Sequence, residues 1–130
     1  MLQMYRPTGG VAPIAEVRGW LKGYAGPARD SVDTWIVKRE ALCFEWQSRA
    51  WLPWFQFDRH TMAPHMPLRA VLAELNAVHD PWEVANWFAL PNPWLGQRVP
   101  VETLLSDLPG VLHAARADCV IANGNARLSG

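Results

Sequence analysis

The segment from Trp87 to Leu104, WFALPNPWLGQRVPVETL, constrains the fold of this chain most. It places three prolines and a Leu-Gly pair inside sequence that otherwise has helical periodicity. Pro91 sterically disfavours the α conformation at the preceding residue, so a helix should end at Leu90. Pro100 fits the first turn of a helix and should open the next one. The segment therefore predicts a break between two helices.

The residues of this break each fit a defined position in a sharp turn. Asn92 can cap a new turn by accepting a backbone hydrogen bond, and Pro93 fits the first position of that turn. Gly96 can adopt the positive φ that ends a single turn. We therefore expect a rigid elbow in which Trp94 and Leu95 pack back against the preceding helix.

Helical periodicity flanks this elbow on both sides. Before it, apolar residues recur from Leu68 to Val78, and Asp80 can cap a second helix. After it, Asp107 can cap a last helix that carries an apolar stripe. We expect a helical module over residues 67–124, followed by a polar tail, residues 125–130, that frays.

Residues 11–58 have a different pattern, in which two short helical stretches are followed by strand-like alternation. The alternation starts at Leu42 and resumes after a polar turn, residues 47–50, which indicates one β-hairpin. Pro53 in the returning strand fits an edge strand, because proline cannot donate a hydrogen bond to a neighbouring strand. Helix, tight break, helix and hairpin is the order of a small winged helix-turn-helix.

Two short segments complete the expected organisation. Residues 1–10 end in Pro-Thr-Gly-Gly and should form a loose N-terminal arm. Residues 59–66 lie in a stretch of prolines, histidines and methionines and should form a linker. The expected fold is mainly α with one β-hairpin: a small winged-helix-like segment that is packed on, or followed by, a helical module.

The composition predicts a globular cytoplasmic protein. The formal net charge is zero, so the chain as a whole lacks the basic signature of nucleic-acid binding, although the first half has a slight excess of Lys and Arg. The N-terminus has no apolar signal-peptide core, and no apolar run approaches the length that spans a bilayer. Cys43 and Cys119 lie in apolar surroundings, as reduced cytosolic thiols do.

The second helical stretch, DSVDTWIVKRE, is the expected recognition helix of the N-terminal segment. Asp33 should be exposed on it and would repel DNA phosphates. In a competing interpretation, Lys38 and Arg39 only complement the helix dipole, and Arg49 belongs to an ordinary polar turn. The candidate DNA contacts are Arg29, Thr34, Lys38, Arg39 and Arg49.

Patterns for catalysis or metal binding are weak. His60 and His65 match no close metal-ligand spacing, and the two cysteines are expected to be small core residues rather than nucleophiles. Tryptophans 46, 51 and 54 could stack on sugars or single-stranded bases, but packing between the hairpin and the helices is the favoured interpretation. We therefore expect no enzyme activity, no metal and no cofactor.

The elbow segment resembles the signature of the toxin-binding domain of the Xre/MbcA/ParS antitoxin family. DPWEVANW, residues 80–87, also fits the family, and WFQFD, residues 54–58, loosely resembles the joint that follows the DNA-binding part of a related architecture. The resemblance covers residues 67–122 well and residues 10–58 weakly. The matching positions in this chain are Trp87, Pro91, Asn92, Leu95, Gly96, Pro100 and Leu104.

The resemblance implies an antitoxin that neutralises a cognate toxin, often of the NAD-degrading RES type, by direct protein contact. It also implies a homodimer that represses its own operon when the N-terminal part binds operator DNA. The surface for the toxin would lie on the elbow and the last helix, with Asn92, Trp94, Arg98 and Arg116 as candidate contacts. Trp94 could instead belong to the core.

Two other functions fit the same sequence. The first is a DNA-binding transcriptional regulator without a toxin partner, in which the C-terminal module only serves dimerisation. The second is a structural domain whose binding functions have decayed.

Overall fold

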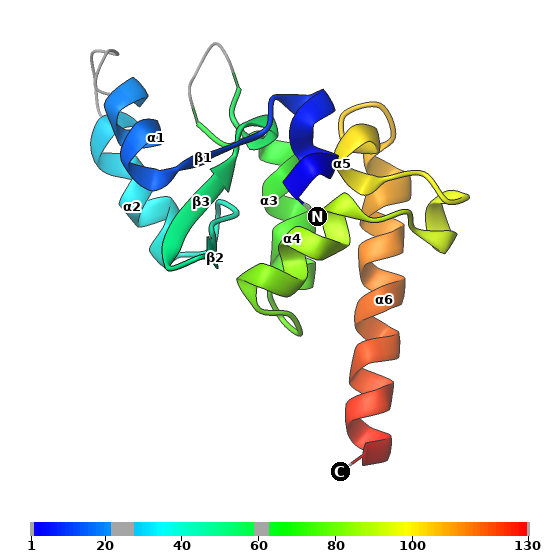
Figure 1. Cartoon of the computed structure of the whole chain (residues 1–130). Helices are drawn as coiled ribbons and strands as arrows, with labels where there is room; N and C mark the ends of the chain where they lie inside the picture. Colours follow the sequence, from blue (N-terminus) through cyan, green and yellow to red (C-terminus); the bar gives the residue numbers. More distant parts are fainter. Residues whose placement is uncertain (1, 22–27, 59–62, 130) are drawn as a thin grey trace.

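The computed structural model describes residues 2–21, 28–58 and 63–129. It is mostly helical with a small antiparallel sheet, which confirms the mainly helical class expected from the sequence (Figure 1). The elements in chain order are the 3-10 helix η1 (Leu2–Thr8), β1 (Val11–Pro13), α1 (Ile14–Leu21), α2 (Ala28–Val37), β2 (Phe44–Trp46), β3 (Arg49–Pro53), the 3-10 helix η2 (Trp54–Gln56), α3 (Met66–Leu75), α4 (Pro81–Ala89), the 3-10 helix η3 (Pro93–Leu95), α5 (Pro100–Thr103) and α6 (Leu108–Ser129).

The predicted hairpin is present as β2 and β3. Its two-residue turn has positive φ at Gln47 and Ser48, 50° and 62°, a combination that matches the right-handed twist of the flanking strands. The expectation of a single hairpin was incomplete, because β1 pairs antiparallel with β3 and gives a sheet in the order β1-β3-β2. β1 has only three residues, too few to produce a recognisable alternation in the sequence.

The edge-strand assignment of Pro53 is wrong, because β3 is the central strand of the sheet. Pro53 is nevertheless tolerated there because it is the last residue of β3, paired with Val11. The next residue, Trp54, donates its backbone N–H to the carbonyl of Gly10 at 3.0 Å and continues the hydrogen bonding past the proline. The missing donor therefore falls at the end of the ladder.

Two clusters of buried residues hold these elements together. The smaller cluster joins the sheet to α1 and α2 and includes Val17, Val32 and Leu52. The larger cluster lies among α3, α4, α5 and α6, and it also contains Leu42 and Phe44 from the N-terminal segment. The N-terminal segment is thus packed on the helical module. In Figure 1, α1, α2 and the sheet lie on one side and α6 on the other, with η1 between them.

The expected loose N-terminal arm is wrong for residues 2–8, which form η1. Tyr5 is fully buried in the larger cluster, and its hydroxyl donates a hydrogen bond of 2.6 Å to the carbonyl of Ala85 in α4. Its ring also stacks on Phe55, with 6.0 Å between ring centroids. Burial raises the pKa of Tyr5, so the phenol stays protonated and keeps donating.

Most of the predicted helix starts are confirmed. The carboxylate of Asp80 accepts from the backbone N–H of Glu83, which accepts in return from Asp80, so α4 begins with a capping box. Asp107 accepts from the backbone N–H of Gly110 at 3.1 Å and caps α6. Residues 125–129, expected as a polar tail, continue α6 as helix. None of the described helices is long and apolar enough to cross a membrane.

The burial of Tyr5 gives a stability test of the N-terminal segment. Tyr5→Ala should lower the free energy of unfolding by about 3–5 kcal/mol, because it leaves a cavity beneath α4 and removes a buried hydrogen bond. Arg6→Ala, an exposed change on the same 3-10 helix, should stay within about 0.5 kcal/mol. Urea denaturation measures both, and equal midpoints for the two variants would show that η1 is not packed in solution.

Candidate partner-binding site

The elbow forms where the sequence predicts it. Leu90 ends α4 in an extended conformation, with φ −106° and ψ 148°. Asn92 caps η3, because its side-chain oxygen accepts from the backbone N–H of Trp94 at 2.8 Å. Gly96 ends the turn in the left-handed conformation with φ 63°. The local chemistry of Pro91, Asn92 and Gly96 therefore fixes the path of the backbone.

The carboxylate of Asp118 in α6 anchors this elbow. Its Oδ2 atom accepts from the indole N–H of Trp87 at 2.8 Å and from the amide of Asn92 at 2.9 Å. Asn92 is buried, so its amide would lose a hydrogen bond without this acceptor. One side chain of α6 thus ties the end of α4 and the start of η3 to the last helix.

Arg98 closes the elbow on its other side. Its backbone carbonyl accepts from the N–H of Asn92 at 3.1 Å, and its Nε donates to the carbonyl of Leu95 at 2.9 Å. Its guanidinium also pairs with Asp107, the cap of α6, at 2.9 Å. The hydrogen bond from Arg98, followed by that from the backbone of Gly110, lowers the pKa of Asp107.

Trp94 and Leu95 take different directions from this turn. Leu95 enters the larger cluster as predicted, whereas Trp94 is 49% exposed and packs edge-on against His113 of α6. The expectation that both pack back on α4 is therefore wrong for Trp94. Consecutive side chains of a 3-10 turn point about 120° apart, so only one of them can face the core. The exposed ring resolves the alternative left open by the sequence.

Exposed side chains continue from Trp94 along α6. His113, Arg116 and Val120 are spaced three and four residues apart and therefore share a helix face. Arg116 is held by Glu74 of α3, with 3.1 Å between Nε and Oε1, and Val120 is 71% exposed. We call the surface formed by Trp94, His113, Arg116 and Val120 the elbow surface. Arg98 and the exposed Leu90 lie in the same connection between α4 and α5.

The candidate DNA contacts are distributed over α2 and the hairpin. Thr34 and Lys38 are exposed at the C-terminal part of α2 and just beyond it, and Arg49 is exposed at the start of β3. The guanidinium of Arg49 lies 6.0 Å from the ring of Trp51. The side chain of Arg29 lies outside the part that the structure describes.

The partly exposed Arg39 contacts the helical module. Its guanidinium donates to the carbonyls of Asn76 and His79 at 3.2 and 2.8 Å, at the C-terminal end of α3. The side chain of Asn76 donates back to the carbonyl of Arg39 at 2.8 Å. The backbone of Arg39 has a positive φ of 56°, where it ends α2 in the position that glycine usually takes. We call this pair the Arg39–Asn76 clasp.

Two other charged residues change the expected recognition surface. Arg18 of α1 forms an ion pair with Asp33 of α2. Asp33 is exposed, as expected, and its carboxylate is paired with a cation from α1. The structure therefore brings Thr34 and Lys38 to one exposed end of α2 but keeps Arg39 away from them.

Sequence reasoning missed Asp118, which holds the elbow, and Asn76, which binds Arg39. The elbow gave one indirect signal, because an Asn amide and a Trp N–H in a buried turn need an acceptor from another element. No local pattern identified which of the acids in the chain would supply it. Asn76 gave no signal, because its partner lies 37 residues earlier.

Within the described residues, no group of three His, Cys, Asp or Glu side chains could hold a metal ion. His60, considered with His65 in the sequence, lies outside the described residues. Burial is the main cause that raises the pKa of the Cys43 thiol to about 11, followed by the charge of Glu45. Burial also raises the pKa of Cys119. Both thiols therefore stay protonated near neutral pH, the form that is the weaker nucleophile.

Comparison of the chain with known protein families, with curated proteins and with solved structures gave no match.

Two glycines with open space around an added Cβ test the backbone strain of the left-handed turn: Gly96 in the elbow and Gly19 in α1. Gly96→Ala should lower the free energy of unfolding by about 1–2 kcal/mol, because its φ is positive although nothing lies within 4 Å of an added Cβ. Gly19→Ala in α1, which also meets nothing within 4 Å, should raise it by about 0.5–1 kcal/mol. Thermal or urea unfolding measures the stability of both variants. A Gly96→Ala variant that is more stable than the wild type would contradict the left-handed turn.

The Arg98–Asp107 pair can be tested by titration. Arg98→Ala should move the pKa of Asp107 up toward its ordinary value, because the main cause of its depression is removed. NMR titration of the carboxyl carbons reads this shift, with Arg116→Ala as a control that leaves Asp107 unchanged. In the wild type, the stabilisation linked to Asp107 should be present above its unfolded pKa and lost as the pH falls through its folded pKa. If the pKa of Asp107 in the wild type has its ordinary value, the interaction between Arg98 and Asp107 is contradicted.

Proposed function

We propose that this protein is an antitoxin-like adaptor that binds and blocks a cognate protein through the elbow surface. The observation that carries the proposal is the half-exposed ring of Trp94 on a turn that is fixed from both ends. An exposed tryptophan near arginines is the composition of energetic centres in protein interfaces. Arg116 lies one turn beyond His113, the α6 residue that Trp94 contacts, and Arg98 lies in the same connection as Trp94.

The rigidity of the elbow supports binding over a purely structural role. The backbone is held by Asn92, by the left-handed Gly96 and by the anchor to Asp118. A side chain displayed on a fixed turn loses little conformational entropy when a partner covers it, so more of its contact energy appears as affinity. This segment resembles the toxin-binding domain of the Xre/MbcA/ParS family. The resemblance points to a toxin as the cognate protein, and RES-type toxins are one class that fits.

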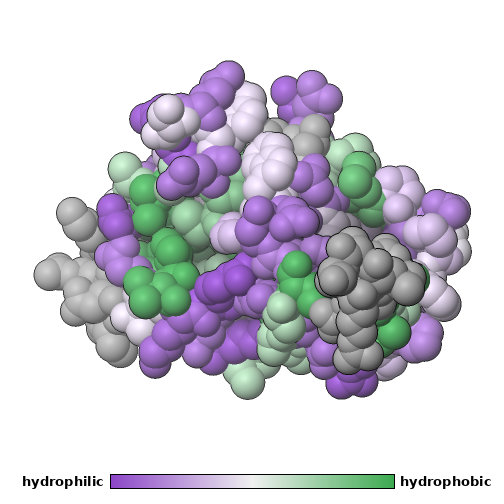
Figure 2. Space-filling view, turned by 90° about the horizontal axis from the view of Figure 1, so that it is seen from below, coloured by the Kyte–Doolittle hydropathy of each residue, from purple (hydrophilic) through white to green (hydrophobic). Residues whose placement is uncertain are grey.

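Further apolar surface, including exposed side chains toward the end of α6, favours a protein partner in a second way. Figure 2 shows a face on which hydrophobic residues gather toward the side of α1 and α2, with smaller hydrophobic areas beside the end of α6. On α6, Val120 and Ile121 are exposed. Apolar side chains exposed on a projecting helix suit contact with another protein, and we propose a homodimer as the second contact of this helix.

DNA binding is the second candidate function, as operon repression by an antitoxin or as the role of a transcriptional regulator that only dimerises through its C-terminal module. Thr34, Lys38 and Arg49 are exposed and could contact phosphates. Two observations make it the weaker candidate. The guanidinium of Arg39 is engaged by the carbonyls of Asn76 and His79, and the acidic Asp33, paired with Arg18, lies on the same helix as Thr34.

The test is affinity capture from nuclease-treated lysates of the source cells with matched tryptophan variants. Trp94→Ala should lower the recovery of the partner by tenfold or more, since loss of an interface hot spot costs about 2 kcal/mol or more. Trp46→Ala, which removes an exposed tryptophan on the hairpin, should leave recovery unchanged. Quantitative mass spectrometry compares the captured proteins, and circular dichroism checks that both variants are folded.

The captured protein must then behave as a toxin. Its expression alone should stop growth, and co-expression with the wild-type chain, but not with Trp94→Ala, should restore it. Equal rescue by both would contradict the elbow surface as the binding site. Recovery of DNA alone, lost on nuclease treatment, would support the regulator instead.

A further inference from the structure

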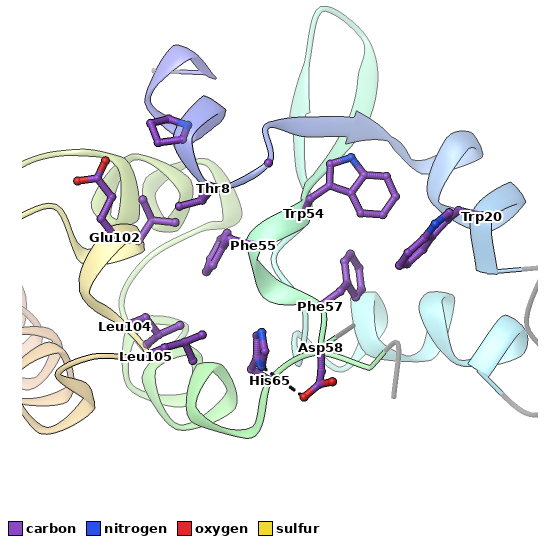
Figure 3. A pocket seen from close by; sticks show the side chains of 13 residues that line it. Thr8, Trp20, Trp54, Phe55, Phe57, Asp58, His65, Glu102, Leu104 and Leu105 are labelled. Carbon is purple, nitrogen blue, oxygen red and sulfur yellow. Dashed lines mark ion pairs between the residues drawn. The ribbon is translucent and has the colours of Figure 1, made fainter. Parts of the chain in front are cut away.

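A cavity of about 960 Å³ opens between the N-terminal segment and α5, away from the elbow surface. Figure 3 shows its lining, to which α1, η2 and α5 contribute side chains. Its volume falls within the range of small-molecule sites, which are mostly apolar with a few polar groups. The proposed contact with a protein partner makes no use of this cavity.

One wall of the cavity is a corner of aromatic rings. The rings of Trp20 and Trp54 meet edge to face, with 4.9 Å between centroids and 76° between planes. Trp54 also meets Phe57 at 6.0 Å and 62°. Figure 3 shows these three side chains gathered on the same side of the cavity. Rings set at steep angles present electron-rich faces in more than one direction, which is the arrangement that attracts an organic cation.

The ionisable groups of the described lining are two carboxylates and one histidine, His65. Asp58 and Glu102 are carboxylates, and none of the described lining residues is Lys or Arg. Asp58 lies 3.8 Å from Nδ1 of His65, below the aromatic corner in Figure 3, and Glu102 stands on the α5 side. A phosphate or carboxylate ligand would meet like charge here and no Lys or Arg from the described lining. A cation would meet opposite charge.

From this combination we infer that the cavity binds a small organic cation: an ammonium group attached to an aromatic or aliphatic body. The ammonium would lie against the rings of Trp20 and Trp54, and the body would contact the apolar remainder of the lining, which includes Phe55 and Leu104. The apolar area would bind the body of either a cation or a neutral molecule of the same shape, and the ring faces add attraction for the cation alone. The site stands on different residues from the elbow surface, so each can fail without the other.

The test compares two probes of the same shape on the full chain. Benzyltrimethylammonium carries the cation, and neopentylbenzene replaces its nitrogen by carbon and is neutral. Ligand-observed NMR should give a dissociation constant at least threefold lower for the cation, because cation–π attraction adds to the shared apolar contact. Phenylacetate, an anion of similar size, should bind more weakly than either. Equal binding of the cation and its neutral analogue would overturn the inference.

Matched variants locate the binding. Glu102→Gln, an exposed change that keeps the shape of the side chain, should weaken cation binding about twofold to fivefold and leave the neutral probe unaffected. Trp20→Leu should weaken cation binding about threefold to tenfold. The controls are Glu45→Gln and Trp94→Leu, which remove the same groups outside the cavity. Binding that falls equally in the controls, or in none of the variants, would contradict this site.

Discussion

The hydrogen bonds to the carboxylate of Asp118 are the interaction on which the elbow depends. One oxygen accepts from the indole of Trp87, at the end of α4, and from the amide of Asn92, at the start of η3. Asn92 is buried and Trp87 is partly buried, and a buried donor left without a partner costs about 1–3 kcal/mol. A single residue of α6 therefore holds the turn between the two helices against the last helix, and the exposed ring of Trp94 is displayed on that anchored turn.

Contacts of a similar kind join the N-terminal segment to the helical module. Tyr5 reaches α4 through a buried hydroxyl, and the Arg39–Asn76 clasp connects the end of α2 to the end of α3. The guanidinium of Arg39 donates to carbonyls at the C-terminal end of α3. Its positive charge therefore stabilises the contact between the N-terminal segment and the helical module. The aromatic cavity lies along the same junction, with walls from α1, η2 and α5. The fold thus places two candidate binding surfaces on one body: the elbow on its C-terminal side and the cavity between its two parts.

The elbow could be predicted because Pro91, Asn92 and Gly96 act on the backbone of their immediate neighbours. The capping of α4 by Asp80 was predictable for the same reason. The hydrogen bond from Tyr5 to Ala85 spans 80 residues, and that from Arg39 to His79 spans 40, so no periodicity within either segment announced them. At the candidate site, the sequence identified Trp94 and Arg98 but could not decide between core and surface for Trp94, because that choice depends on how η3 sits on α6.

The solvent accessibility of Trp94 in the captured complex shows whether a partner covers the elbow surface. Hydroxyl-radical footprinting of the protein alone should label both Trp94 and Trp46, which are exposed in the structure. In the complex with its partner, labelling of Trp94 should fall severalfold while labelling of Trp46 is unchanged. If Trp94 is labelled equally in the free protein and in the complex, the elbow does not form the interface.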